Sequence, residues 1–322
     1  MALSFSVPDT ELSATLHNRR AGVVDNIFKK SPFLSQMKRF GAVETIDGGL
    51  EIVQPLRYAK NTSAGSFDGY DVLDTTPQDV LTSVRYPWAQ DYATITISMV
   101  EEKKNQGRGR LLNLLNQKID DAETTARDLL ATQLLAVAPA SGSKDPISLT
   151  EIVQTTRSNA PARVASIGNI SGATYSWWRN RTTVGGAFSV SDMNTMYNGV
   201  SDGSDFPNIA LTSQTVYEYY ENSQVGQIRY ADTKAADAGF QTLMFKQMPI
   251  AWDPLIGITD SMYFINFDHL KLGIMKGMDF ITTDFIEPDN QAAKTAKILF
   301  MGNLFCVARR RQGSLNAITA PA

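Results

Sequence analysis

The sequence predicts an α+β chain with four parts: a polar arm, a projecting β-hairpin, a long helix and a mixed α/β body. Three observations carry this prediction. Two strand-like segments, the second with a period of two, flank a long polar stretch, residues 57–93. An apolar stripe of helical spacing then begins at Leu112, and the chain after residue 262 is rich in strand-like phrases.

Residues 1–45 are predicted to form an extended arm with short helical pieces. They are polar and mixed in character, with basic pairs at Arg19-Arg20 and Lys29-Lys30. Pro32 interrupts any long helix, because proline has no backbone N–H and clashes with the preceding turn. Such an arm needs another surface to lie against.

The second part is predicted to be a long hairpin with strands at residues 50–56 and 94–100. In the later strand Ile95, Ile97 and Met99 alternate with hydroxyl residues, which gives one apolar face. A loop as long as the one between these strands is uncommon in a compact domain unless it binds elsewhere. Because an isolated hairpin is marginal in water, we expect a neighbouring molecule beneath it.

The strongest helical pattern follows the glycine-containing segment 107–109. Its apolar residues recur at steps of three and four. They are Leu112, Leu115, Ile119, Ala122, Ala126 and Leu129. The helix is predicted to end near Val137, before Pro139, which gives about 28 residues and a length of roughly 42 Å. It must lie across a large surface; a coiled coil is the alternative, although only about three heptads are present.

The rest of the chain reads as a mixed α/β body. Thr212 or Ser213 is expected to cap a helix that begins at Gln214. Residues 309–313 are expected to close the last strand in a polar turn. The predicted strands are 205–211, 242–245, 249–252, 262–267, 270–274 and 298–308.

Composition and charge exclude several classes of protein. The 322 residues, 43% of them hydrophobic, suffice for one large domain or two ordinary ones. The net charge of −3 argues against a protein whose main task is to grip nucleic acid, since such binding depends on phosphate neutralisation. The single cysteine, Cys306, excludes an intramolecular disulfide and lies in an apolar run that predicts a buried thiol. Without a signal peptide or a membrane-spanning window, we expect an intracellular protein with no membrane partner.

Catalytic and metal-binding patterns are missing from the sequence. The two histidines, His17 and His269, show no metal-ligand spacing, and neither a nucleophile elbow nor a phosphate-binding loop occurs. Asp68, Asp71 and Asp74 stand three apart but lack the register of a calcium loop, so a solvated or salt-bridging acidic loop is expected. We therefore predict no enzymatic activity, no metal and no cofactor.

Arg309, Arg310 and Arg311 follow the last predicted strand. Two interpretations stay open for them. They are salt-bridge donors at the surface or between subunits, or they contact DNA phosphate without sequence specificity.

Two tryptophans stand side by side, Trp177 and Trp178, with Tyr175 before them and Arg179 and Arg181 after them. A platform for stacking on nucleic-acid bases is disfavoured, because the chain lacks a basic excess. Adjacent side chains point in different directions, so one ring can fill the core while the other meets another surface. We expect a structural joint, with Arg179 or Arg181 making a charge-assisted hydrogen bond within or between subunits.

The order of these parts resembles the major capsid proteins of tailed double-stranded-DNA bacteriophages, whose shell fold also builds encapsulin compartments. The resemblance covers nearly the whole chain from about residue 20. It is carried by the order and spacing of four phrases, at residues 172–181, 205–213, 249–254 and 262–270.

This resemblance implies a division of the chain into an arm, an extended loop, a peripheral domain with the long spine helix, an axial domain and returning strands of the peripheral domain. The implied boundaries are 1–45, 46–100, 101–144, 145–261 and 262–322. It also implies hexamers and pentamers that close into an icosahedral head around packaged double-stranded DNA. The location would be the virion capsid, and the host cytoplasm during assembly.

Further partners follow from the same resemblance: a portal, a decoration protein and a scaffolding protein. The scaffolding protein is expected to be separate, since the chain starts at Met1 without a long helical extension. Some family members crosslink a lysine of the extended loop to an asparagine of a neighbour. Lys60 lies in that loop, but a lone lysine there is expected to be a surface charge, with the crosslink as the alternative. Lys60, Asp68 and Asp71 join the aromatic segment as candidates for subunit contacts.

Two other functions stay open. A cargo-holding compartment of the same fold would assemble without portal or DNA, and a hydrolase would use the carboxylates of residues 68–74. The long arm and the long hairpin rich in Asp and Ser favour the phage head.

Overall fold

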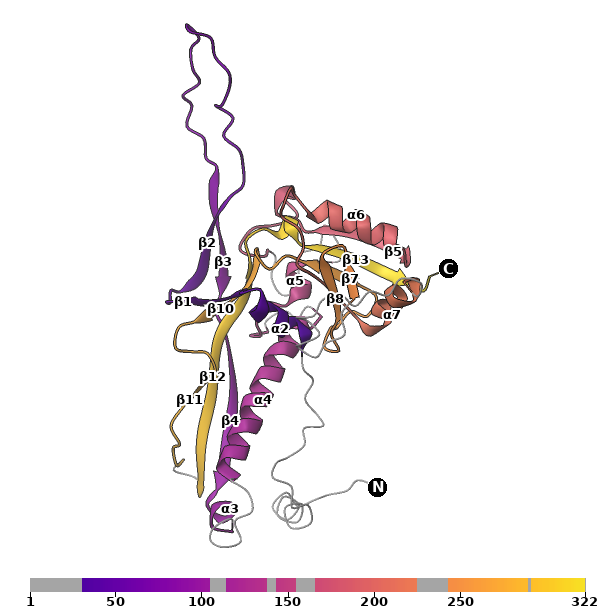
Figure 1. Ribbon diagram of the computed structural model, residues 1–322. Coiled ribbons are helices and arrows are strands. Elements are labelled where there is room, and N and C mark those ends of the chain that lie inside the picture. Colours follow the sequence, from indigo (N-terminus) through magenta and orange to yellow (C-terminus); the bar gives the residue numbers. More distant parts are fainter. Residues whose placement is uncertain are drawn as a thin grey trace.

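The computed structural model of the chain describes residues 31–104, 114–137, 143–154, 166–224, 243–288 and 291–321. Two sheets lie beside each other, and a two-stranded hairpin stands out from the molecule (Figure 1). The predicted α+β class is confirmed. The arm up to residue 30, the segment 107–109, Leu112 and Pro139 lie outside the described residues.

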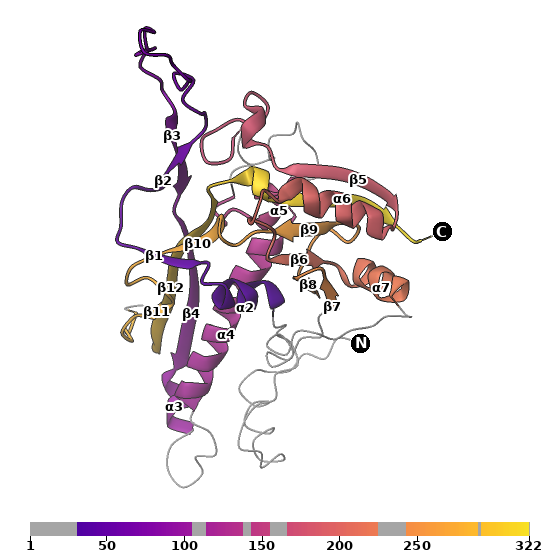
Figure 2. The ribbon, with the colours of Figure 1, turned by 45° about the horizontal axis from the view of Figure 1, so that its top comes forward.

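The projecting hairpin consists of β2 (Glu51–Arg57) and β3 (Leu81–Pro87), which pair antiparallel along their whole length. Residues 58–80 continue it away from the body as a long loop (Figures 1 and 2). The prediction that residues 94–100 form the second strand of this hairpin is wrong. Met99 begins a short helix, and residues 94–98 belong to β4 (Ala89–Ser98), which pairs with a strand near the C-terminus. Its Ile95 and Ile97 are buried in the body, and a two-stranded hairpin could not cover them.

The long sheet is organised around β12 (Ala293–Cys306), a strand of 14 residues. The strand order is β1-β10-β12-β11, and β4 also pairs with β12. Only β1 and β10 run parallel among these pairs; the pairs made by β12 are antiparallel. The other strands are β1 (Val43–Ile46), β10 (Leu270–Met275) and β11 (Ile281–Thr282).

Helix α4 (Leu114–Leu135) is the predicted long helix, and it lies against β4 and β12 (Figures 1 and 2). Its 22 residues span about 33 Å. The buried stripe runs at steps of four through Ala122, Ala126, Leu130 and Leu134, a row of side chains that faces the strands. The prediction that Leu129 belongs to this stripe is wrong, because Leu129 lies off the row and is 39% exposed. The chain's own sheet covers the stripe, so the coiled-coil alternative is excluded for these residues.

The second sheet has six strands in the order β5-β13-β9-β6-β8-β7. Helices α6 (Val190–Val200) and α7 (Gln214–Ser223) pack on it through Met193, Met196, Val216 and Tyr220. The Ser213 side chain accepts a hydrogen bond from the backbone N–H of Val216, which confirms the predicted cap. The strands are β5 (Arg181–Ala187), β6 (Ile209–Thr212), β7 (Leu243–Phe245), β8 (Met248–Trp252), β9 (Met262–Ile265) and β13 (Gly313–Thr319).

The strands of residues 262–322 are divided between the two sheets. They do not all return to one sheet: β9 and β13 pair in the six-stranded sheet, while β10 and β12 pair in the long one. The predicted closing turn at 309–313 is the short 3₁₀ helix η3 (Arg309–Arg311), and β13 follows it. Strand β13 escaped prediction because Leu315 and Ile318 are its only large apolar residues.

The remaining helices are short. They are α2 (Pro32–Arg39), α3 (Met99–Lys104), α5 (Leu149–Ile152) and the 3₁₀ helix η2 (Ser176–Trp178). No helix in the described ranges is long and apolar enough to cross a membrane.

The contact between α4 and the long sheet generates a stability prediction. Ala126 packs in a cluster with Ile95, Ala296 and Ile298. Ala126→Leu adds volume to this well-packed contact and should lower the free energy of unfolding by about 1–3 kcal/mol in urea titrations. Thr125→Leu, at the exposed neighbouring position, should change it by less than about 0.5 kcal/mol. Equal effects of the two variants would contradict the assigned helix face.

Candidate assembly surface and domain joint

The tip of the hairpin is an exposed apolar surface with acidic residues among the apolar ones. Tyr70 and Val72 are fully exposed, and Phe67 and Leu73 are more than half exposed. Residues 61–84 contain four aspartates and no lysine or arginine. Soluble proteins rarely leave such a patch uncovered, so the tip is a candidate surface for binding another molecule.

The carboxylates at the tip are used by the backbone of their own loop. Asp71 Oδ2 accepts a hydrogen bond from the Asp68 N–H at 2.8 Å, and Asp68 Oδ1 accepts one from the Gly69 N–H at 2.8 Å. The hydroxyl and backbone N–H of Thr76 both donate to Asp74 and lower the pKa of that carboxyl group. In the described ranges, no group of three His, Cys, Asp or Glu residues is placed to hold a metal ion. These aspartates therefore shape a loop.

Lys60 lies where the loop leaves the paired strands. It lines an open hollow together with Arg57, Tyr58 and Asn61. The crosslinking alternative for Lys60 stays untested, because it concerns a neighbouring subunit.

The root of the hairpin is fixed to the end of β12. Tyr86 is fully buried; its hydroxyl donates to the Cys306 carbonyl at 2.8 Å and accepts from the Cys306 N–H at 3.2 Å. Burial raises the pKa of Tyr86 well above its ordinary value and that of the Cys306 thiol to about 12, so both groups stay neutral. The Asn303 side chain also donates to the Pro87 carbonyl at 2.7 Å. The hairpin thus has a rigid base and an uncovered tip.

The two adjacent tryptophans meet different surroundings, as the sequence predicts. Trp178 is 1% exposed, and its Nε1–H donates to the Ile167 carbonyl at 2.8 Å. Trp177 is half-buried and stacks on Tyr58 at the hairpin root, with ring centroids 5.6 Å apart and planes at 26°. Tyr175 is exposed and lies 5.8 Å from the Trp177 ring. The aromatic segment therefore braces the hairpin, a contact that sequence reasoning missed.

Residues 166–179, here called the clamp segment, press closely on β3. A Cβ atom on Gly168 would lie 3.0 Å from Val84 Cβ and 3.1 Å from the Tyr86 ring, and the φ of +62° favours glycine. The Arg179 guanidinium donates to the carbonyls of Gly172 and Ala173, which are charge-assisted bonds within the subunit. Arg181 begins β5, and its backbone N–H donates to the Gln312 carbonyl at 3.0 Å.

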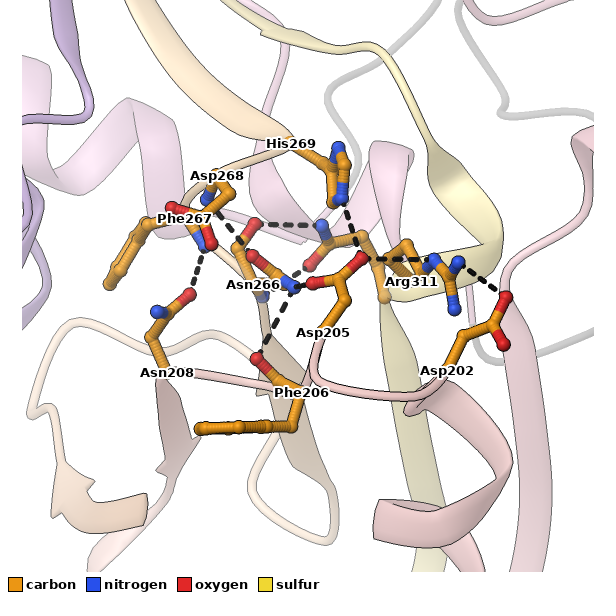
Figure 3. Close-up of polar contacts among 10 residues, drawn as sticks. Asp202, Asp205, Phe206, Asn208, Asn266, Phe267, Asp268, His269 and Arg311 are labelled. Atoms are coloured by element: carbon orange, nitrogen blue, oxygen red, sulfur yellow. Dashed lines mark hydrogen bonds and ion pairs between the residues drawn. The ribbon is translucent and has the colours of Figure 1, made fainter. Parts of the chain in front are cut away.

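A second polar cluster lies where the chain crosses between the two sheets (Figure 3). The Asp205 carboxylate accepts from Asn266 Nδ2 at 2.5 Å and lies 2.9 Å from His269 Nε2 and 3.2 Å from Arg311 Nε. Arg311 also pairs with Asp202 at 2.6 Å. Burial raises the pKa of Asp205, but the hydrogen bonds from His269 and Asn266 outweigh burial and hold that pKa below its ordinary value.

The three consecutive arginines have different surroundings. Arg309 is buried, and its guanidinium donates to the Ile152 carbonyl at 2.9 Å and to Asn180 Oδ1 at 3.3 Å. The predicted phosphate contact of Arg309 is therefore wrong, since the group is withdrawn from any surface. Arg311 is an intramolecular salt-bridge donor, and Arg310 is exposed. For Arg310, phosphate contact stays a prediction.

A remote residue caps the helix of the arm. The Asp253 carboxylate accepts from the Ser31 hydroxyl at 2.6 Å and from the Phe33 N–H at 3.2 Å, so it satisfies the start of α2. The capping residue lies some two hundred positions from the helix, and no local sequence pattern points to it. Asp253 therefore ties the described end of the arm to the six-stranded sheet.

Comparison with known proteins places the fold. No family model matches the chain, and no curated protein matches it. Among solved structures, the capsid asymmetric unit of cyanophage A-1(L) is similar with a TM-score of 0.74 at 16% identity, covering 94% of this chain and 97% of that chain. The capsid of Myoviridae phage XM1 has a TM-score of 0.53 at 13% identity, covering 98% and 99%. The holo-SrpI encapsulin complex from Synechococcus elongatus PCC 7942 has a TM-score of 0.58 at 8% identity, covering 99% and 96%.

These matches extend over nearly the whole chain. The protein therefore has the shell fold that tailed-phage capsid proteins share with encapsulins, as the sequence resemblance implied. Identities this low establish the fold alone.

The clamp segment generates a prediction about its two tryptophans. Trp178→Ala empties a buried site and removes the hydrogen bond to Ile167, so it should lower the free energy of unfolding by about 3–5 kcal/mol. Trp177→Ala removes mainly a stacked aromatic pair and should cost about 1 kcal/mol. Urea unfolding followed by circular dichroism measures both. Equal costs would contradict the assignment of one ring to the core and the other to the hairpin.

The capping residue Asp253 generates a prediction with a pH dependence. Asp253→Ala removes the acceptor for α2 and should cost about 1–2 kcal/mol, while Asp253→Asn keeps an acceptor oxygen and should cost less. Burial raises the pKa of Asp253 despite the hydrogen bonds from Ser31, Leu255 and Phe33. The folded state therefore binds a proton on Asp253 more tightly than the unfolded state does. The stability that this gives is fully present below the unfolded-state pKa of about 3.9, and it is lost as the pH rises through the raised folded-state pKa.

Asparagine does not titrate. The free energy of unfolding of the wild type, relative to Asp253→Asn, should therefore rise as the pH is lowered from 7 toward 4. Urea titrations of both proteins across this range measure the difference. A difference that falls with decreasing pH would show that the folded-state pKa is lowered instead.

Proposed function

We propose that this chain is a structural major capsid protein that assembles into a closed shell. The observation that carries the proposal is the match of nearly the whole chain to the cyanophage A-1(L) capsid chain, with a TM-score of 0.74. The match covers 94% of this chain and 97% of that chain.

The hairpin supports the proposal on physical grounds. Its apolar tip would be a liability on an isolated subunit, and its two strands have no third strand to support them. Its root is nevertheless fixed by Tyr86, Asn303 and Trp177, so the tip is held at a defined place. A rigid hairpin with an uncovered tip suits a heterologous contact, in which a patch on one copy meets a different patch on the next.

The assembly that follows is an icosahedral shell of hexamers and pentamers around packaged double-stranded DNA, with which the chain makes non-specific contact. A net charge of −3 suits a wall along which DNA moves without being held. A portal, a separate scaffolding protein and a decoration protein complete the proposed partners. The protein would reside in the virion capsid after assembly in the host cytoplasm. The role is structural, without catalysis.

The residue ranges of the proposed domains change with the sheet topology. The hairpin with residues 51–87 is the extended loop, and the long sheet with α4 is the peripheral domain. The six-stranded sheet, including β9 and β13, is the axial domain.

A compartment shell of the encapsulin kind is the second candidate, favoured by the TM-score of 0.58. The higher TM-score of the cyanophage capsid chain favours the phage head. A hydrolase based on residues 68–74 has no support in the geometry, because Asp68, Asp71 and Asp74 accept hydrogen bonds from their own loop.

Deletion of residues 62–78 tests the role of the hairpin. The deletion spares both paired strands and all root contacts, so the free energy of unfolding should change by less than about 1 kcal/mol. Sedimentation velocity should show fast-sedimenting shells or capsomers for the wild type and subunits for the variant.

A matched control keeps the loop and changes only its charge. Asp79→Asn lies outside the apolar tip and should still assemble. Normal assembly of the deletion variant would overturn the role of the tip. A deletion variant that unfolds would show that the loop belongs to the core.

A further inference from the structure

Two short segments carry the chain between the sheets. Residues 266–269 link β9 of the six-stranded sheet to β10 of the long sheet. Helix η3 links β12 of the long sheet to β13 of the six-stranded sheet. Any change in the angle between the sheets must be accommodated at these two crossings.

We propose that Asp205 is a latch that holds the six-stranded sheet at a fixed angle to the long sheet, and that the buried Arg309, in the same short helix as Arg311, is the pivot. The proposal concerns motion within one subunit, and it goes beyond a role in shell assembly.

The latch joins groups that belong to different sheets. Asp205 lies in the loop that leads from α6 into β6, on the six-stranded side (Figure 3). His269 lies at the root of β10, and its carbonyl accepts from the Val307 N–H at 2.9 Å, so it moves with the long sheet. The bond between His269 Nε2 and Asp205 Oδ2 at 2.9 Å therefore spans the joint.

The second crossing holds the same carboxylate. Arg311 on η3 places its Nε 3.2 Å from Asp205 Oδ2 and pairs with Asp202 at 2.6 Å. The loop itself is preorganised, because the backbones of Asp202 and Asp205 bond reciprocally around Gly203, whose φ is +63°. One carboxylate thus meets a donor from each crossing.

The latch and the pivot differ in how deeply their side chains are buried. The side chains of Asp205, His269 and Arg311 are 27%, 30% and 22% exposed, so water can replace their contacts one at a time. Arg309 is 3% exposed, and breaking its bonds to Ile152 and Asn180 would leave a buried cation without acceptors. The joint should therefore open at Asp205 and stay closed at Arg309.

The test measures the angle between the sheets directly. Spin labels on Thr125→Cys in α4 and Ser191→Cys in α6 report across the joint; both positions are exposed, and the native Cys306 is buried. The full chain is labelled and diluted with unlabelled chain, so that distances within one subunit are read. The distance distribution should be narrow in the wild type and clearly broader in Asp205→Asn.

Hydrogen exchange gives a second readout. The Phe267 amide, which donates to Asn208 Oδ1 at 2.7 Å from the first crossing to the six-stranded side, should exchange at least about tenfold faster in Asp205→Asn, which corresponds to the loss of one charge-assisted hydrogen bond. Amides within β6 and β9 should exchange at the wild-type rate.

Asp202→Asn is the matched control, because Asp202 contacts Arg311 in the same cluster but does not contact His269. It should leave the distance distribution unchanged. If Asp205→Asn fails to fold, His269→Ala serves in its place. It removes the cross-sheet bond while Arg311 and Asn266 still hold Asp205, and it should by itself broaden the distance distribution. The proposal is overturned if the folded latch variants keep the wild-type distribution, or if Asp202→Asn broadens it as much.

Discussion

The pairing of β12 with its neighbours is the constraint on which the rest of the structure depends. This strand holds β4 along one edge and β10 and β11 along the other, and its buried face with Ile298 and Ala296 receives α4. Its last residues, Asn303 and Cys306, anchor the hairpin root, and η3 follows directly. A single strand therefore sets where the helix lies, where the hairpin points and where the chain turns toward the second sheet.

The contrast between the root and the tip of the hairpin connects this architecture to function. Tyr86 is buried at the root, Trp177 stacks on Tyr58, and the clamp segment approaches closely because Gly168 has no side chain. At the tip, the aspartates satisfy their own loop while Tyr70 and Val72 face solvent. Stability is thus concentrated where the hairpin leaves the body, and the surface left uncovered is the one that a second copy of the chain would cover.

Local patterns in the sequence predicted the elements that local forces dominate. The helical stripe of α4, the alternation in β4 and the Ser213 cap all follow from periodicity or from a capping residue next to its helix. Pairing could not be predicted in the same way: β4 could have paired with β2, and only burial beneath α4 selects β12. Strand β13 was missed because its polar residues Ser314 and Asn316 are buried through hydrogen bonds that the sequence pattern does not show.

The candidate sites show the same difference between local patterns and long-range contacts. The aromatic segment was recognised from Trp177 and Trp178 as a joint, but its partner Tyr58 lies far away in the sequence. Asp205 and His269, and likewise Asp253 and Ser31, meet only after the two sheets have formed, so no spacing rule identifies them. The most direct test of the proposed function is electron microscopy of the purified full chain, alone and co-expressed with the scaffolding protein proposed above. The expected result is closed, uniform shells with a lattice of hexamers and pentamers. A chain that stays monomeric under every condition would contradict the proposed function.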